Sequence, residues 1–276
     1  MRKNLNLTKI ERSRLIRLAK KCRQTVLKMH KEAQAGHIGA AFSCLDILVY
    51  LYFQQMEKRD RFILSKGHAA TALYAVLAQA GIISKKDLKT FHQDGTHLAA
   101  HPPCSGEVAG ITFGTGSLGH GLSLATGLAL STRFSKKKFQ VYCLISEGDI
   151  NEGSTWEAIL FAAQHQLNNL TVIVDYNGLQ AFGRSEEVLS LHPLADKWRA
   201  FNFDVFEVLD GHDFNQLHRA FIASELNSSD RPKCIIAKTV KGKGISYMED
   251  KLEWHYLSMD DDQFKEASKQ IKESNA

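Results

Sequence analysis

Short runs of Val, Ile and Leu alternate along this chain with longer segments that have helical spacing. The candidates for buried strands are RFILSKG, FQVYCLIS, LTVIVDYN, DVFEVLD and KCIIAKTV. Strands that are apolar on both faces and separated by helices are typical of a parallel sheet covered on both sides. The pattern therefore predicts an α/β fold with a doubly wound parallel sheet and helices on both faces.

Helical spacing predicts a long first helix from about Thr8 to Gln34, ended by Gly36. A second apolar segment, SCLDILVYLYF, has Ser43 as its predicted N-cap. Further helices are predicted in HAATALYAVLAQAG, GHGLSLATGLALSTRF, WEAILFAAQHQ and the tail DDQFKEASKQIKES. The segment from Gln93 to Gly121 is irregular, and long irregular segments inside compact domains are more often functional than idle. With no internal repeat or linker, residues 1–276 are predicted to form one domain with an N-terminal helix and a C-terminal helical tail.

Length and composition suit an ordinary globular protein, with 276 residues, 44% hydrophobic and 24% charged. The N-terminus lacks the apolar core of a secretory signal, and we expect no segment to cross a membrane. Five cysteines without a C-x-x-C pair favour free thiols in a reducing compartment. We therefore expect a cytoplasmic protein with no membrane partner.

Part of the net charge of +5 lies in the basic segment from Arg2 to Lys31. A basic patch could attract nucleic acid or phosphorylated molecules. Apolar residues recur at helical spacing between the charges, so we interpret the segment as one solvated helix face and expect no nucleic-acid partner. These apolar residues are Leu15, Leu18, Cys22, Val26 and Met29.

Polar residues follow two of the predicted strands directly. Glu147 and Gly148 come after one strand, and Asn177 and Gly178 after the next. Ligands of such sheets collect at the carboxyl ends of the strands. A carboxylate, an amide oxygen and a nearby backbone carbonyl suit Mg²⁺ better than zinc, because they are hard ligands.

Two further features extend this pattern to a phosphate. Gly148 lets a phosphate approach the backbone, and the helix predicted near Ser154 offers free N–H groups to an anion. Together these residues predict a metal–diphosphate site. Two ordinary turns remain the alternative, since Asn-Gly is a common turn pair.

This spacing resembles the thiamine-diphosphate motif of transketolases, in which Gly-Asp-Gly is followed by Glu-Gly and about thirty residues later by Asn. Aligned on Asn151-Glu152-Gly153, the metal-binding Asp of the family falls on Glu147. Asn177 then lies thirty positions later, and Leu179 stands where the family supplies a backbone carbonyl. The alternative alignment uses Gly148-Asp149 as the motif, which would make Asp149 the ligand but shortens the spacing.

Other stretches carry the same resemblance, in the family's order, from about residue 10 to 258. EAQAGHIGAAFSCLDIL is similar to the N-terminal Ser-Gly-His-Pro-Gly segment, and DRFILSKGHAATALYAVL to the Leu-Ser-x-Gly-His-Ala segment. LAAHPPCSGEVAGITFGTGSLGHGLSLATGLAL resembles the Gly-His-Pro and Gly-x-Leu-Gly-x-Gly loops. KTVKGKGISYMEDKLEWHY resembles the end of the same domain. Two positions depart from the family, with Glu147 in place of Asp and Ile38 in place of Pro.

The resemblance implies roles for particular residues. It places His68 and His255 near the diphosphate and the substrate, and His37 and His101 near the reacting carbon. Imidazole suits proton transfer near neutral pH. It implies that the cofactor-binding residues are His68, Gly116, Ser117, Leu118, Gly148 and Asn177, that the metal ligands are Glu147, Asn177 and Leu179, and that Glu152 lies at a subunit interface.

The implied function is transfer of a two-carbon ketol unit between small sugar substrates, with thiamine diphosphate and Mg²⁺ as cofactors. Family enzymes also need a glutamate from a second, pyrimidine-binding domain, and we expect a partner subunit to supply it. The chain thus resembles the N-terminal subunit of a split transketolase that also self-associates near Glu152. Two alternatives remain: another thiamine-dependent synthase, such as one that decarboxylates pyruvate, and a non-catalytic scaffold that retains the fold.

Overall fold

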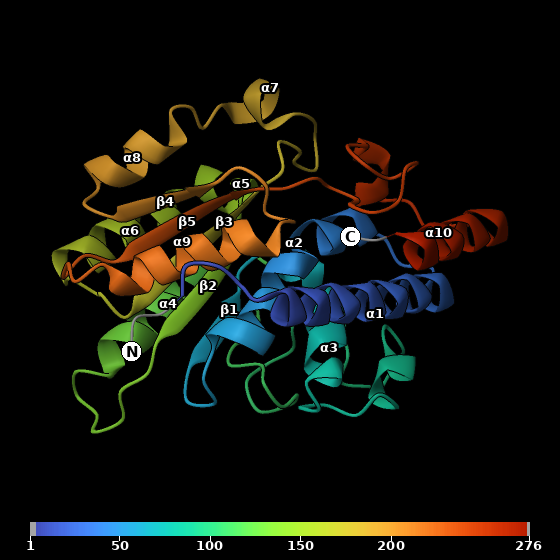
Figure 1. Ribbon diagram of the computed structural model, residues 1–276, viewed down its shortest axis with the longest axis horizontal. Helices are drawn as coiled ribbons and strands as arrows, with labels where there is room; N and C mark the ends of the chain where they lie inside the picture. Colours follow the sequence, from blue (N-terminus) through green and yellow to red (C-terminus); the bar gives the residue numbers. More distant parts are fainter. Residues whose placement is uncertain (1–3, 275–276) are drawn as a thin grey trace.

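A five-stranded, all-parallel sheet in the order β1-β2-β3-β5-β4 forms the centre of the protein (Figure 1). The computed structural model describes residues 4–274. The prediction of a doubly wound parallel sheet is confirmed, and each of the predicted strands is present. The strands are β1 (Arg61–Leu64), β2 (Val141–Ser146), β3 (Leu170–Tyr176), β4 (Asp204–Val208) and β5 (Lys233–Lys238).

Helices connect the strands and cover both faces of the sheet, with α9 passing in front of it in Figure 1. Short turns complete the fold: a π-helical turn η1 (Leu51–Gln55) and three 3₁₀ turns, η2 (Gly67–Ala69), η3 (Asp87–Thr90) and η4 (Leu252–His255). The α-helices are α1 (Lys9–Ala33), α2 (Ile38–Tyr50), α3 (Ala70–Gln79), α4 (His120–Ser131), α5 (Glu147–Asn151), α6 (Gly153–Gln164), α7 (Ser185–Leu189), α8 (Leu194–Ala200), α9 (Phe214–Leu226) and α10 (Asp261–Glu273).

The alternation of side chains along the strands builds one apolar layer on each face. On β2, Tyr142 and Leu144 join the layer of α1, α2, α3 and α9, whereas Val141, Cys143 and Ile145 join that of α4, α6 and α8. Successive side chains of a strand point to opposite faces, so a strand buried on both sides must be apolar throughout. This is why the buried strands read as unbroken hydrophobic runs.

The first helix runs almost as predicted. Thr8 caps α1 through a capping box with Glu11, and Gln34 ends it in the left-handed conformation. The stripe of apolar residues faces the core, with Leu15, Cys22, Val26 and Met29 buried. Leu18 is half-buried and packs against the same layer. Most of the basic residues lie between these positions, as expected for a helix with one solvated face, but Arg23 is buried and only 6% exposed.

Two local predictions need correction or addition. Ser43 does not cap a helix, because α2 begins at Ile38 and Ser43 is buried in its middle, where its hydroxyl bonds Asp175. A short helix, α5, was not predicted between β2 and α6. Ser146 and Asp149 cap it with a capping box, so β2 turns directly into a helix at Glu147.

The second helical segment passes one test for a membrane-spanning helix. Residues 38–55 form a helix that is long and apolar enough to cross a membrane, by length and composition alone. In the fold, 78% of that window is buried. A core helix of a globular protein passes the same test.

All five cysteines are free thiols, as predicted, and Cys104 alone among them is exposed.

Candidate active site

The carboxyl ends of β1, β2, β3 and β5 meet at a cavity of about 510 Å³. The structure brings eleven of the twelve predicted site residues to the wall of this cavity. Ser117 is the exception, because it is exposed between two residues that do line the cavity. The eleven are His37, His68, His101, Gly116, Leu118, Glu147, Gly148, Glu152, Asn177, Leu179 and His255.

Glu147 is the first residue of α5 and joins the ends of β2 and β3. Its Oε2 accepts hydrogen bonds from the backbone N–H groups of Asn177 (2.9 Å) and Gly178 (2.7 Å). Its Oε1 is buried and has no hydrogen-bond partner among residues 4–274. Burial raises the pKa of this carboxyl group, although the Ser185 hydroxyl and the two backbone bonds oppose the rise. The Ser185 hydroxyl is itself buried and makes no hydrogen bond with the described residues. A buried carboxylate oxygen without a donor is costly, so the arrangement favours a cation or a donor at Oε1.

Asp149, the alternative metal ligand, is occupied in a different way. Its Oδ1 accepts from the Ser65 hydroxyl (2.6 Å) and the Gly119 N–H (2.9 Å). Its Oδ2 accepts from the backbone N–H and hydroxyl of Ser146, both at 2.8 Å. Asp149 is fully buried and does not line the cavity, so its carboxylate links three segments of the fold and has no oxygen free for a ligand.

Asn177 and Leu179 lie on the turn after β3. The Asn177 side-chain oxygen accepts the Leu179 N–H at 3.0 Å, and its amide group donates to the Ser43 hydroxyl at 3.0 Å. The Leu179 carbonyl lies 3.4 Å from the Lys241 ammonium, a long contact. These two oxygens and Glu147 Oε1 come from the same pair of strand ends.

These oxygens fit Mg²⁺. The unpartnered Glu147 Oε1 supplies a carboxylate, and Asn177 and Leu179 add an amide and a carbonyl oxygen. Within the described residues no group of three or more His, Cys, Asp or Glu side chains could hold a metal. The protein ligands are therefore few, and phosphate oxygens would have to complete the coordination shell.

Four histidines cluster on the cavity wall. The His37 ring lies 4.8 Å from that of His255, 5.6 Å from His68 and 6.2 Å from His101, measured between ring centroids. Burial lowers the pKa of all four imidazoles, and that of His255 falls to about 3. They are therefore neutral at neutral pH, and each can donate a proton from one nitrogen and accept one at the other.

The backbone of His37 is strained, with φ of 73°. Its N–H donates to the His255 carbonyl, and its own carbonyl accepts from Ala40 and Ala41 at the start of α2. A non-glycine residue in this region persists only where its surroundings hold it, and such strain clusters at functional sites. Hydrogen bonds thus hold His37 in this chain, which has Ile38 where the family has proline.

Two lysines of the cavity were not recognised from the sequence. Lys66 is only 1% exposed and is paired with the equally buried Asp175, and its ammonium also donates to the Ala40 carbonyl at 3.2 Å. Burial lowers the pKa of Lys66, but Asp175 outweighs it and holds the pKa above its usual value. Lys66 therefore stays charged beside the cavity.

Lys241 has no carboxylate partner among the described residues. Its ammonium contacts the Leu179 and Gln180 carbonyls and lies 2.9 Å from His255 Nδ1. Burial, followed by repulsion from Lys66, lowers the pKa of Lys241 to about 8. The hydrogen-bond partners of this buried ammonium are all neutral, so its charge is available to an anionic ligand in the cavity. Both lysines lie in stretches that carry the family resemblance, so proximity to the motifs was the available signal.

The loop before α4 approaches the cavity closely. A Cβ at Gly67 would lie 2.9 Å from the backbone of Thr115 and Gly116, so glycine permits this contact. Leu118 contacts Gly148, where a Cβ would lie 2.9 Å from its side chain. Glu152 is exposed at the start of α6, next to Gly119, on the rim of the cavity.

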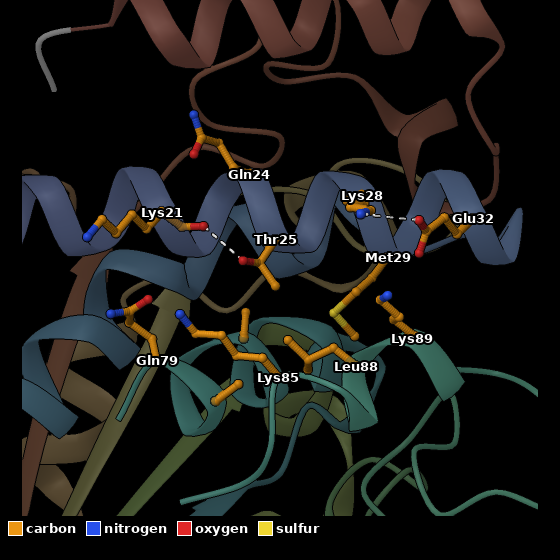
Figure 2. A pocket seen from close by; sticks show the side chains of 12 residues that line it. Lys21, Gln24, Thr25, Lys28, Met29, Glu32, Gln79, Lys85, Leu88 and Lys89 are labelled. Atoms are coloured by element: carbon orange, nitrogen blue, oxygen red, sulfur yellow. Dashed lines mark hydrogen bonds and ion pairs between the residues drawn. The ribbon is translucent and has the colours of Figure 1, made fainter. Parts of the chain in front are cut away.

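A second hollow of about 400 Å³ lies between α1, α3 and η3 (Figure 2). Lys21, Lys28, Lys85 and Lys89 surround an apolar floor, and the Lys28 ammonium lies 3.6 Å from Glu32. None of the predicted site residues lines this hollow. It holds part of the basic charge that the sequence pattern assigned to a solvated helix face.

The sequence matches the family described as "Transketolase, thiamine diphosphate binding domain" over residues 16–273. The chain therefore belongs to the transketolase family and is a transferase subunit with a thiamine-diphosphate-binding domain. Mg²⁺ is the usual partner ion of the cofactor in this family.

Several relatives of similar length are named as subunits of transketolases. The chain is 39% identical over 264 residues to one subunit of the apulose-4-phosphate transketolase of Phocaeicola vulgatus, covering 92% of each chain. It is 36% identical over 250 residues to one subunit of a 6-deoxy-6-sulfo-D-fructose transketolase of a Clostridium species, covering 87% of this chain and 90% of the relative.

Solved transketolases share the fold. The structure from Campylobacter jejuni superimposes with a TM-score of 0.86 and 28% identity, over 94% of this chain and 42% of that one. The structure from Leishmania mexicana gives a TM-score of 0.87 and 25% identity, over 94% of this chain and 41% of that one. The chain thus spans about two fifths of the length of these longer enzymes.

Proposed function

We propose that this chain is the diphosphate-binding subunit of a split transketolase, and that its cavity holds Mg²⁺ and the diphosphate of thiamine diphosphate. The buried Glu147 Oε1 carries this proposal, because it lacks a partner among the described residues and belongs to the cavity of the four histidines. Glu147, Asn177 and the Leu179 carbonyl would bind the metal. Lys66 and Lys241 would balance the charge of the diphosphate.

The histidines would serve proton transfer and substrate binding. Thiamine diphosphate, when bound, supplies a nucleophilic carbon and a ring that accepts an electron pair. His37 and His101 would exchange protons with the hydroxyl groups of the sugar at the reacting end. His255 accepts a hydrogen bond from Lys241 at Nδ1, so as a neutral ring it carries its proton on Nε2 and can donate it.

The partner would be a C-terminal transketolase subunit that carries the pyrimidine-binding domain. Phe182, Val188 and Leu189 line the cavity and are exposed, with Phe182 at 83%. An exposed apolar rim around a site that must bury a thiamine ring suits a second protein wall. Glu152, exposed on the same rim, would support self-association of the assembled enzyme in the cytoplasm.

The substrates would be ketoses and aldoses that carry an anionic group. Two relatives of similar length are named for a sugar phosphate and a sulfo-sugar, both of which are anionic. Turnover of ketoses with a phosphate, a sulfonate or no charged group, measured in the assembled enzyme, would test this substrate class. Equal turnover of the uncharged ketose would contradict it, and release of CO₂ from pyruvate would point to a decarboxylating synthase.

Calorimetric titration with thiamine diphosphate and Mg²⁺, with and without the partner subunit, tests the proposed site. Asn177→Ala should abolish metal-dependent binding and leave the chain folded, with a lower unfolding temperature because the Leu179 N–H and the Ser43 hydroxyl each lose a hydrogen bond. Unchanged affinity in that variant would refute the ligand set. A wild-type chain that gives no binding heat with the partner present would instead be a non-catalytic scaffold.

A further inference from the structure

A buried ion pair outside the cavity packs against the loop of residues 240–243, which carries Lys241. Arg23 of α1 binds Asp46 of α2 with two parallel hydrogen bonds, of 3.0 Å and 2.5 Å. Both side chains are at most 8% exposed. His212, on the loop between β4 and α9, places Nδ1 2.7 Å from Asp46 Oδ2. The Arg23 guanidinium beside the buried Asp46 carboxyl outweighs desolvation and lowers its pKa to about 2, so the carboxylate is charged.

The geometry determines which nitrogen of His212 carries the proton. The Val240 N–H donates to His212 Nε2 at 2.9 Å, and a backbone N–H can only donate. Nε2 is therefore an acceptor, and the proton of the neutral ring lies on Nδ1, where it is donated to Asp46. His212 thus connects a buried carboxylate to one backbone amide, which belongs to the residue before Lys241.

The same loop is held at two further points. The Gly242 N–H donates to the Gly39 carbonyl at 2.9 Å, and Arg23 Nε lies 3.4 Å from the Lys243 carbonyl. Lys241 is therefore bracketed by anchored residues on both sides. Its ammonium extends from this anchored loop to the Leu179 and Gln180 carbonyls and to His255.

We propose that Arg23, Asp46 and His212 are positioning residues of the active site. They hold residues 240–243 so that the Lys241 ammonium stays in the cavity, against the turn after β3 and next to His255. None of the three lines the cavity. They act through Lys241, and their effect on cofactor binding rests on the function proposed above.

His218 provides a matched control for His212. Its imidazole is also buried and also makes two hydrogen bonds, to the Tyr50 hydroxyl and the Asn4 carbonyl, both at 2.9 Å. Neither of these partners belongs to the Lys241 loop. His212→Ala and His218→Ala should therefore lower the unfolding temperature similarly, while differing at the site.

The experiment uses the full chain and has two measurements. Hydrogen exchange without cofactor should become at least tenfold faster across residues 239–244 in His212→Ala and should not change there in His218→Ala. In complex with Mg²⁺ and the partner subunit, His212→Ala should bind thiamine diphosphate at least tenfold more weakly, with His218→Ala within twofold of wild type. His212→Gln should recover part of the affinity, since its amide oxygen can accept the Val240 N–H. If His212→Ala does not fold, the same two measurements on His212→Gln provide the test.

Equal losses of affinity in His212→Ala and His218→Ala would overturn the proposal, because destabilisation alone would then explain them. Faster exchange with unchanged affinity would also overturn it, since the loop would be loosened without consequence for the site. A wild-type chain that does not bind thiamine diphosphate would contradict the proposed function, whereas the exchange measurement, made without cofactor, would still decide the anchoring.

Discussion

At the scale of single residues, the site combines a carboxyl group and an amino group whose charged forms are both disfavoured by burial. Burial raises the pKa of Glu147, and burial and Lys66 lower the pKa of Lys241. Such opposed shifts destabilise the empty fold and are relieved when a metal and a diphosphate bind. Removing the charge of either residue should therefore weaken ligand binding without destabilising the empty fold.

Glu147→Gln should weaken metal-dependent binding of thiamine diphosphate at least tenfold, or about 1.4 kcal/mol. The amide keeps the shape and one acceptor oxygen for the Asn177 and Gly178 N–H groups but loses the charge. The raised pKa means that the ionised form of Glu147 destabilises the fold above its unfolded pKa. The unfolding temperature at pH 7 should therefore be unchanged or higher. Glu147→Asp, which keeps the carboxylate, is the control and should retain metal dependence. Equal affinity of wild type and Glu147→Gln would remove Glu147 from the ligand set.

Lys241 predicts how cofactor affinity depends on pH. The ammonium is charged below a pH of about 8, and a bound diphosphate would raise its pKa again. Affinity should be full below pH 8 and should decline as the pH rises above it. Stability of the empty chain should follow the opposite course, rising between pH 8 and the unfolded pKa of lysine, because the unfolded state binds the proton more tightly.

Lys241→Met should flatten both pH profiles, which calorimetry and thermal unfolding between pH 7 and 10 would measure. A decline in affinity that is unchanged in this variant would assign the titration to another group.

At the scale of elements, Asp149 connects the ends of β1 and β2 to the loop before α4. It makes its four contacts with Ser65, Gly119 and Ser146, and it also caps α5. The α5 turn is what aims Glu147 at the turn after β3. Asp149 thus shapes the site without lining the cavity.

Asp149→Asn should destabilise the fold by about 1–3 kcal/mol, because its amide would place a donor against an existing donor. The unfolding temperature should fall by about 2–4 °C for each kcal/mol. Thiamine diphosphate affinity, measured well below the transition, should remain nearly normal. Metal affinity lost without loss of stability would favour Asp149 as the ligand and reverse the alignment.

At the scale of the whole molecule, the site lies at the carboxyl ends of the strands, and part of its rim is exposed. The solved family enzymes are more than twice as long, and relatives of this length are named as one subunit of a transketolase. The exposed apolar rim at Phe182, Val188 and Leu189 is where a second subunit would complete the cavity.

Phe182→Asp should weaken binding of the partner subunit at least tenfold and leave the unfolding temperature of the isolated chain unchanged, because the side chain is 83% exposed. Phe134→Asp is the matched control, since Phe134 is 86% exposed and does not line the cavity. Analytical ultracentrifugation of the mixed subunits would measure both. Similar losses in the two variants would show a general effect of the added charge and place the partner elsewhere.

Local pattern in the sequence was sufficient to predict the strands, most of the helices and the order of the motifs. Hydrophobic periodicity depends on neighbours along the chain, and the inner strands β2, β3 and β5 are largely apolar because both of their faces are covered. The edge strand β4 is only half-buried and has Glu207 exposed, although the sequence pattern predicted a buried strand there. The motif spacing also brought Glu147 and Asn177 to adjacent strand ends, since parallel strands have their carboxyl ends at one edge. Eleven of the twelve predicted site residues accordingly line one cavity.

The tertiary structure alone decided which polar groups are free. Motif spacing favoured Glu147 over Asp149 as the ligand, and only the contacts of Asp149 with Ser65 and Gly119 show that its oxygens are already occupied. Ser43 resembled an N-cap in the sequence but forms a hydrogen bond with Asp175. Nothing in the local sequence distinguished Lys241 from the other lysines, and only the fold shows that it lines the cavity. Hydrogen-bond partners and burial are set by residues distant in sequence, so local pattern could not reveal them.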